Sequence, residues 1–384
     1  MPSSTVIYGA TQSVAMTIAL LGLMPNAEAA VVISSEGGWE ASINGSLPVF
    51  MVMSDGDSPA QGVSGENGTR IQSGFNPASL TFHVAAPAAN GLQVSAHVQF
   101  DTHLNGNSQN DNARFESRVA EIQVQGSYGT VSIGKGFGIF NSAAIGDIAS
   151  QGGVGLLGGE AADSAGTTGG RIGTGYVYAN FNPHITYTSA NIGGVKIELG
   201  IVNPEEPGGQ SRLIETDTPR FEGQIDYAKT YDSGSIRIWS GFMHQEVSVV
   251  ASDFDYDMQG FDIGGHLDYG VFGLTFSITD TTGIGANGLY GTSLNDAEVR
   301  ATQWYIEADV NTGKTIYGVS YGEGEQKQET TAVGSAEDGK NELAMLFVHH
   351  KLTPQLKLIG ELQTYKSDTL TDYNALSIGA QFDF

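Results

Sequence analysis

Residues 373–384 read Tyr-Asn-Ala-Leu-Ser-Ile-Gly-Ala-Gln-Phe-Asp-Phe, and this stretch decides the fold. From Leu376 onward, every second residue is apolar and the residues between are polar or glycine. Because successive side chains of a β-strand point to opposite faces, the segment is predicted to be one strand with an apolar and a polar face. We expect it to be the last strand of a sheet whose two faces meet different surroundings.

The composition limits the class of protein. The 384 residues include 53 glycines and no cysteine, and the formal net charge is -25. No run of about 20 apolar residues follows the N-terminal region, which argues against a helical membrane protein. The missing cysteines exclude disulfides and thiol catalysis, and the acidic balance argues against a nucleic-acid partner, whose phosphates would be repelled.

Residues 1–29 resemble a targeting segment. A short apolar core, Met16 to Met24, precedes Ala27-Glu28-Ala29, which offers a small-residue cleavage site. No Lys or Arg occurs before Arg70, so the basic start expected of a signal peptide is missing. A retained N-terminal helix is the alternative. Residues 30–384 are predicted to form a single domain.

Alternating segments of about ten residues follow one another to the end of the chain. Short turns rich in Gly, Asn, Asp and Pro alternate with longer polar connections, an asymmetry typical of bacterial outer-membrane barrels. The pattern predicts an all-β, transmembrane antiparallel barrel with short turns on the periplasmic side. We count sixteen strands, at roughly 38–53, 70–86, 90–103, 113–127, 129–140, 180–190, 193–203, 219–231, 234–247, 256–269, 271–281, 299–311, 313–325, 339–352, 355–367 and 373–384.

Charged residues recur on one face of these strands. In the strand at 219–231, for example, Glu222 and Asp226 alternate with Phe221 and Ile225. Because lipid suits only the apolar face, the charged face is predicted to line water, and sixteen strands enclose an aqueous channel. The predicted pore-lining residues are His184, Glu222, Asp226, Arg237, Asp262, Asp268, Glu307, Asp309 and Glu361.

Several segments resemble those of general diffusion porins of Gram-negative bacteria. They are residues 129–136 (Gly-Thr-Val-Ser-Ile-Gly-Lys-Gly), residues 69–75 (Thr-Arg-Ile-Gln-Ser-Gly-Phe) and residues 185–189 (Ile-Thr-Tyr-Thr-Ser). The terminal Phe384 is similar to the family's assembly signal. The resemblance spans the predicted mature chain and implies a homotrimer in the outer membrane, in contact with lipid, lipopolysaccharide and the barrel-assembly machinery.

The resemblance also implies a third loop that folds into the barrel, here residues 141–179. Its charged residues Asp147, Glu160, Asp163 and Arg171 are expected at the constriction, facing bases on the wall. The candidate wall bases are Arg70, Arg114, Arg118 and Lys135. Strict alternation places Lys135 toward lipid, and a bulge at Gly134 or Gly136 would turn it inward. For Arg114 and Arg118, a rim or surface position is the alternative.

These features predict passive diffusion of ions and small hydrophilic solutes. Inward acids outnumber inward bases, which predicts weak cation selectivity. The alternative is a substrate-specific channel for a sugar, an organic acid or phosphate. A Ser/His/Asp catalytic arrangement is not marked by any motif, so an enzyme is not expected.

One acidic motif suggests a metal. Asp253, Asp255 and Asp257 have the opening spacing of a calcium loop, but Met258 replaces the turn glycine and Gly264 stands where a bidentate Glu is needed. No cofactor is expected, with loop-bound Ca²⁺ as a weak possibility. A solvated acidic loop is the alternative.

Overall fold

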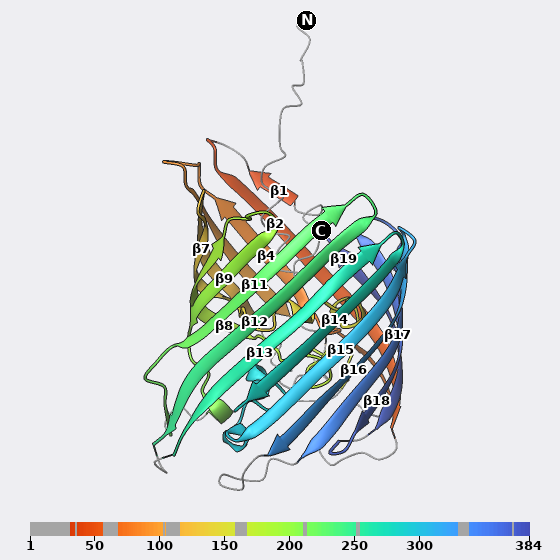
Figure 1. Ribbon diagram of the computed structural model, residues 1–384. Helices are drawn as coiled ribbons and strands as arrows, with labels where there is room; N and C mark the ends of the chain where they lie inside the picture. Colours follow the sequence, from red (N-terminus) through yellow and green to blue (C-terminus); the bar gives the residue numbers. More distant parts are fainter. Residues whose placement is uncertain are drawn as a thin grey trace, which may run out of the picture.

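The computed structural model describes residues 31–34, 37–56, 68–102, 104, 116–157, 167–209, 213–250, 254–328, 338–370 and 372–384. Their backbone forms one antiparallel sheet that closes on itself, because β19 pairs with β2. Figure 1 shows the tilted strands of this barrel. The wall strands are β2 (Glu40–Gly56), β3 (Gly68–Gln72), β4 (Ala78–Ala85), β5 (Gln93–Thr102), β6 (Glu116–Gly126), β7 (Gly129–Phe137), β8 (Phe181–Ser189), β9 (Val195–Val202), β11 (Arg220–Tyr231), β12 (Gly234–Val249), β13 (Phe254–Tyr269), β14 (Phe272–Thr282), β15 (Val299–Asn311), β16 (Thr315–Gln328), β17 (Gly339–Lys351), β18 (Leu356–Ser367) and β19 (Tyr373–Asp383).

The segments β3 and β4 form one wall strand, since both pair with β2 in succession. Counted so, the barrel has the sixteen strands that the sequence predicts. The interruption at residues 73–77 turns inward, where the Phe75 N–H donates to the Gly153 carbonyl at 2.9 Å. A side chain at Gly74 would meet that carbonyl, so the close approach requires glycine.

Smaller elements complete the chain. β1 (Val31–Ser34) pairs with the start of β2, and β10 (Ile214–Glu215) pairs with the end of β12. The helical turns are η3 (Ala144–Gly146), α1 (Ile148–Gln151), η5 (Pro207–Gly209), η6 (Leu289–Gly291) and η7 (Leu294–Asp296). None of the helices among the described residues is long and apolar enough to cross a membrane.

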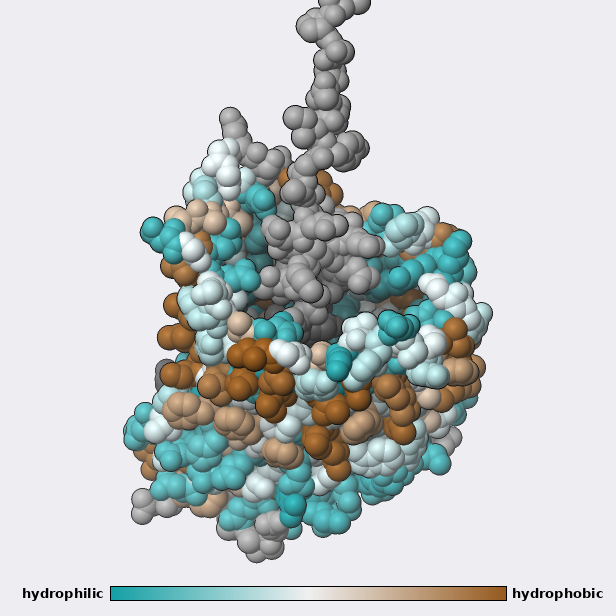
Figure 2. Space-filling view, turned by 45° about the horizontal axis from the view of Figure 1, so that its top comes forward, coloured by the Kyte–Doolittle hydropathy of each residue, from teal (hydrophilic) through white to brown (hydrophobic). Residues whose placement is uncertain are grey.

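The outer face of the wall is apolar, as the alternation predicts. Along β19, the side chains of Ile378 and Phe382 are exposed on the outside, while Ser377 is buried inside. Figure 2 shows apolar side chains gathered in a band around the wall, with hydrophilic residues on either side. The band fits the hydrocarbon core of a membrane.

The barrel encloses hydrophobic clusters, which alternation alone does not predict. One cluster joins Phe50 and Phe347 of the wall to Ala149 and Val154 of the connection between β7 and β8. A second joins Trp239 and Tyr305 to the same connection, and a third lies against β12 and β13. The core of this protein therefore lies inside the barrel, between the wall and an inserted loop.

Candidate pore constriction

The inserted segment is the third loop, residues 138–180, of which 138–157 and 167–180 are described. Asn141 adopts a φ of 64°, and its side chain bonds Val177 N–H at 2.7 Å and Thr279 at 2.7 Å. The Asp147 carboxylate then caps α1 by accepting from Ser150 N–H at 2.9 Å. Together these turns direct the loop into the barrel rather than over its mouth.

Four wall carboxylates hold the third loop by its backbone. Glu222 accepts from Ile139 N–H at 2.6 Å and from Phe140 N–H at 3.1 Å. Asp262 on β13 accepts from Asn141 N–H at 3.0 Å. The strands therefore supply acceptors for loop N–H groups that would otherwise be buried without a partner.

Glu307 and Glu361 repeat the arrangement farther around the wall. Glu307 accepts from Ile148 N–H at 2.7 Å and from the next N–H of α1 at 3.1 Å. Glu361 accepts from Val154 N–H at 3.1 and 3.0 Å, one distance to each carboxylate oxygen. A side chain at Gly153 would collide with the Glu361 carboxylate, so glycine allows this approach.

These four carboxylates were predicted to line water, and that prediction is wrong. Glu222, Asp262, Glu307 and Glu361 are at most 2% exposed, because the third loop covers them. Their side chains point inward as alternation requires. Their role is to anchor the loop, and we call them the four anchor carboxylates.

Asp147 and Arg171 were predicted as constriction charges, but neither presents its charged group to water. Both side chains are fully buried, and Arg171 Nε lies 3.4 Å from Asp147 Oδ2. Arg171 also donates to the Leu343 carbonyl at 3.3 Å and lies over the Tyr305 ring. Burial raises the pKa of the Asp147 carboxyl, and the Arg171 guanidinium opposes that rise. The pair fixes the loop internally.

A second segment, the sixth loop at residues 283–298, also folds into the barrel. Ala286 N–H donates to the Gln326 side chain at 3.1 Å, and the Gln303 side chain donates to the Ala286 carbonyl at 2.9 Å. Ile284 and Leu289 are buried in the third cluster, which includes Phe140 of the third loop. Strand alternation in the sequence does not predict this second insertion.

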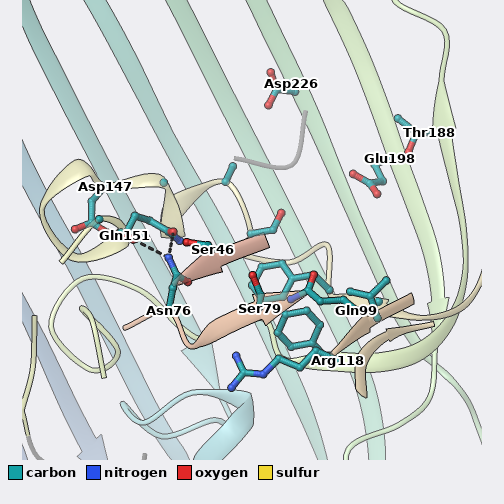
Figure 3. Close-up of a pocket in the computed structure, with 18 of the residues that line it drawn as sticks. Ser46, Asn76, Ser79, Gln99, Arg118, Asp147, Gln151, Thr188, Glu198 and Asp226 are labelled. Atoms are coloured by element: carbon teal, nitrogen blue, oxygen red, sulfur yellow. Dashed lines mark hydrogen bonds between the residues drawn. The ribbon is translucent and has the colours of Figure 1, made fainter. Parts of the chain in front are cut away.

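A chamber of about 830 Å³ remains between the third loop and the short turns. Near the loop it is bounded by Asn76, Gln99 and Arg118 of the wall and by Gln151 of α1 (Figure 3). Asn76 donates to the Gln151 side chain at 3.1 Å, which joins wall and loop at this edge. The chamber thus follows the wall of β4 to β9 past the third loop.

Of the candidate wall bases, Arg118 lines the chamber. Its Nε lies 3.1 Å from Asp101 Oδ2 and 3.3 Å from Glu116 Oε2, and its guanidinium covers the Phe181 ring. Arg70 lies on β3, next to Ile71, whose side chain points outward. Arg70 therefore lies on the inner face of the wall, but it does not line the chamber.

The prediction that Lys135 is a wall base at the constriction is wrong. β6 and β7 pair without a bulge, so Lys135 stays on the outward face with Ile133, and its Nζ donates to the Ser117 carbonyl at 3.0 Å. Strict alternation was the right interpretation, and Lys135 does not reach the constriction. Arg114, Glu160, Asp163 and the predicted signal peptide, residues 1–29, lie outside the described residues.

The other predicted lining residues divide into two sets. His184, Asp226 and Arg237 line the chamber, and Arg237 Nε donates to Asp226 at 2.7 Å. Asp268 is exposed near a short turn, 3.1 Å from His266, and Asp309 is buried on the inner wall away from the chamber.

Glu121 and Glu198 line the chamber but were not singled out from the sequence. Glu121 Oε2 on β6 lies 3.4 Å from His184 Nε2 on β8. Glu198 lies on β9, which follows β8 in the wall. Alternation within β6 carries the signal, since Glu121, Gln123 and Gln125 share the inner face. Applying the alternation rule to every strand would have found them.

The acidic motif near the fifth loop is only partly described. Asp253 lies outside the described residues, and Asp255 and Asp257 are exposed on β13. Within the described residues, no group of three or more metal-binding side chains gathers. A calcium site here stays a prediction.

The comparisons with known proteins agree with this architecture. A search of curated protein sequences finds no match. The anion-selective porin of Comamonas acidovorans is 15% identical, with a TM-score of 0.65 over 90% of this chain and 100% of that chain. The outer-membrane channel DcaP of Acinetobacter baumannii is 13% identical, with a TM-score of 0.68 over 91% of this chain and 99% of that chain. OmpT of Vibrio cholerae in a trimer form is 14% identical, with a TM-score of 0.56 over 90% of this chain and 99% of that chain.

At these identities, the solved structures show a shared fold. Membership comes from the sequence itself, because the family model described as Gram-negative porin matches residues 17–370. This confirms the resemblance found in the sequence. The chain belongs to the Gram-negative porin family, and its barrel is a passive channel of the outer membrane.

Proposed function

We propose that this porin passes ions and small hydrophilic solutes by diffusion along the wall of β4 to β9, with little preference for either sign of charge. The chamber beneath the third loop carries the proposal, because hydrophilic side chains such as Gln99, Gln123 and Thr188 line it. On the opposite side of the third loop, the apolar clusters fill the space between the loop and the barrel wall. The third loop therefore sets the width of the path.

The charges around the chamber explain the revised selectivity. Besides the buried Asp147, its lining includes five carboxylates, Asp101, Glu121, Glu198, Asp226 and Asp383, and six bases, Arg118, Lys196, Arg237, Lys314, Lys351 and Lys357. The expected excess of inward acids rested largely on the four anchor carboxylates, which do not face water. Weak cation selectivity is therefore not supported.

We further propose a homotrimer, as in the trimer form of the similarly folded OmpT of Vibrio cholerae. The terminal Phe384 is proposed as the signal for the barrel-assembly machinery. Its N–H donates to the Gly45 carbonyl at 3.0 Å and its carbonyl accepts from Gly45 N–H at 2.7 Å. The residue thus extends the seam that closes the barrel.

A substrate-specific channel is the second candidate. Two loops, rather than one, occupy the barrel, and three lysines, Lys314, Lys351 and Lys357, lie around the chamber on the side away from Glu121 and Glu198. Confinement and a cluster of bases are features that a channel for anionic solutes would use.

Single-channel recording in a planar bilayer tests the proposal. We expect conductance proportional to KCl concentration, three equal steps per insertion and a reversal potential near zero across a KCl gradient. A conductance that saturates, together with block by one class of anionic solute, would favour the specific channel. Folded protein that forms no channel would contradict both.

A further inference from the structure

Two histidines face each other on the inner wall of the barrel, and neither lines the chamber. His83 on β4 and His97 on β5 are directly paired across the sheet. Phe82 and Val84, which flank His83, are exposed on the outer wall, so alternation places both imidazoles inside. The centroids of the two rings are 4.5 Å apart, with an angle of 37° between their planes. We call these residues the histidine pair.

The histidine pair lies at the turn end of the wall, beside the chamber. His83 is two residues from the end of β4, and a short connection, residues 86–92, leads from there to β5. Short turns of outer-membrane barrels face the periplasm. Glu121 of the chamber lining lies directly opposite His97 on β6. A solute that enters the path from the periplasm therefore passes close to the pair.

One nitrogen of the pair lacks a partner. His97 is only 8% exposed, and its Nε2 makes no hydrogen bond with any described residue. Buried polar atoms are nearly always hydrogen-bonded, and an exception commonly marks the position of a bound water or ion. His83 is less buried than His97, so a small ligand can reach the pair from the lumen.

The charges around the histidine pair favour a cation. Glu121 acts electrostatically on the His97 imidazole from the next strand. Glu40 acts in the same way on His83 from β2, the strand on the other side of β4. Carboxylates therefore flank the two imidazoles on both sides of the pair.

We propose that the histidine pair binds one divalent transition-metal ion, such as Zn²⁺, Cu²⁺ or Ni²⁺, through one nitrogen of each ring. Imidazole is the ligand that these ions prefer, whereas Ca²⁺ and Mg²⁺ prefer oxygen. An ion about 2.1 Å from each nitrogen needs the two nitrogens roughly 3–4 Å apart, which rings at this separation can reach.

Water completes the coordination, because no third metal-binding side chain of the described residues gathers with the pair. A bound ion places two positive charges next to Glu121, at the periplasmic start of the path. The inference rests on the barrel and its orientation, and not on the proposed diffusion.

Titration of the untagged, full-length protein in detergent with Cu²⁺, followed by electron paramagnetic resonance, tests the site. We expect one bound Cu²⁺ with two nitrogen donors. His83→Gln and His97→Gln, which keep a polar side chain of similar size, should each weaken binding about tenfold and remove one nitrogen donor. His184→Gln is the matched control, because His184 also lies on the inner wall, 3.4 Å from Glu121. It has no second imidazole directly opposite it and should keep the wild-type affinity.

Equal β-sheet circular dichroism will show that the variants are folded. Wild-type Cu²⁺ binding in both test variants, or an equal loss in His184→Gln, would overturn the proposal. Competition in the wild type needs no variant: Zn²⁺ should displace Cu²⁺, and Ca²⁺ at the same concentration should not. Displacement by Ca²⁺ as effective as that by Zn²⁺ would assign the ion to carboxylates and would also overturn the proposal.

Discussion

The two sides of the barrel interior use the same residue types in opposite ways. On the wall of β11 to β19, the four anchor carboxylates point inward and are buried against backbone N–H groups of the third loop. On the wall of β5 to β9, Glu121 and Glu198 point inward and line the chamber. The difference teaches that an inward carboxylate is a pore residue only where no loop covers it.

The largest effect is expected inside the third loop itself. Arg171→Leu leaves the Asp147 carboxylate buried without its partner, since both side chains are fully buried. We expect a loss of about 3–5 kcal/mol in the free energy of unfolding, measured by urea denaturation in lipid vesicles.

The double variant Asp147→Leu/Arg171→Leu is the control for that loss. Removing both charges together should restore most of the stability, because no unpaired charge stays buried. A single variant as stable as the wild type would mean that water reaches Asp147, and the contrast between the two sides of the barrel would fail.

The next largest effect tests one anchor. Glu361→Ala removes the acceptor of Val154 N–H and leaves that group buried without a partner. We expect about 1–3 kcal/mol less stability and a larger, noisier single-channel conductance, because the loop segment around Val154 is released from β18.

Glu361→Gln is the matched variant, since the amide oxygen keeps one acceptor. It should retain most of the stability and the wild-type conductance. Equal conductance in Glu361→Ala and wild type would show that the anchor does not position the loop at the constriction.

The barrel itself could be predicted from the sequence because its signals are local. Alternation predicted the strands and their outward faces, and the short turns predicted the order of the strands. Lys135 was a candidate wall base, and strict alternation alone would have placed it outward. The role of Glu361 could not be predicted in this way. In the sequence it alternates with apolar neighbours, as Glu121 does, and its partner Val154 lies 207 residues away.

The inward break in the second wall strand escaped prediction for the same reason. Residues 70–86 read as one strand, and β3 and β4 separate where contacts with the third loop, such as Phe75 with Gly153 and Asn76 with Gln151, draw the chain inward. The sixth loop is likewise held by Gln303 and Gln326, which lie 17 and 40 residues from Ala286 in the sequence.

A smaller effect, on ion selectivity, should distinguish the two sides without changing stability. Glu121→Gln and Glu198→Gln remove charge from the chamber, so the reversal potential across a KCl gradient should move toward anion preference. Glu361→Gln replaces a carboxylate that the third loop covers, so it should shift the reversal potential little. The measurement is best made near 0.1 M salt, because the Debye length is then about 10 Å and the charges on the chamber wall still act on passing ions. Equal shifts in all three variants would mean that the loop does not shield the anchors.

The smallest effect is expected at Lys135, which the register places on the outward face of β7. Lys135→Gln removes one positive charge and the contact of Nζ with the Ser117 carbonyl, so stability should change by no more than about 0.5 kcal/mol. Arg118→Gln removes the same charge from the chamber wall, beside Asp101, and is the matched comparison. The reversal potential should move toward cation preference in Arg118→Gln and stay at the wild-type value in Lys135→Gln. An equal shift in both would place Lys135 within reach of the path and would contradict the regular pairing of β6 with β7.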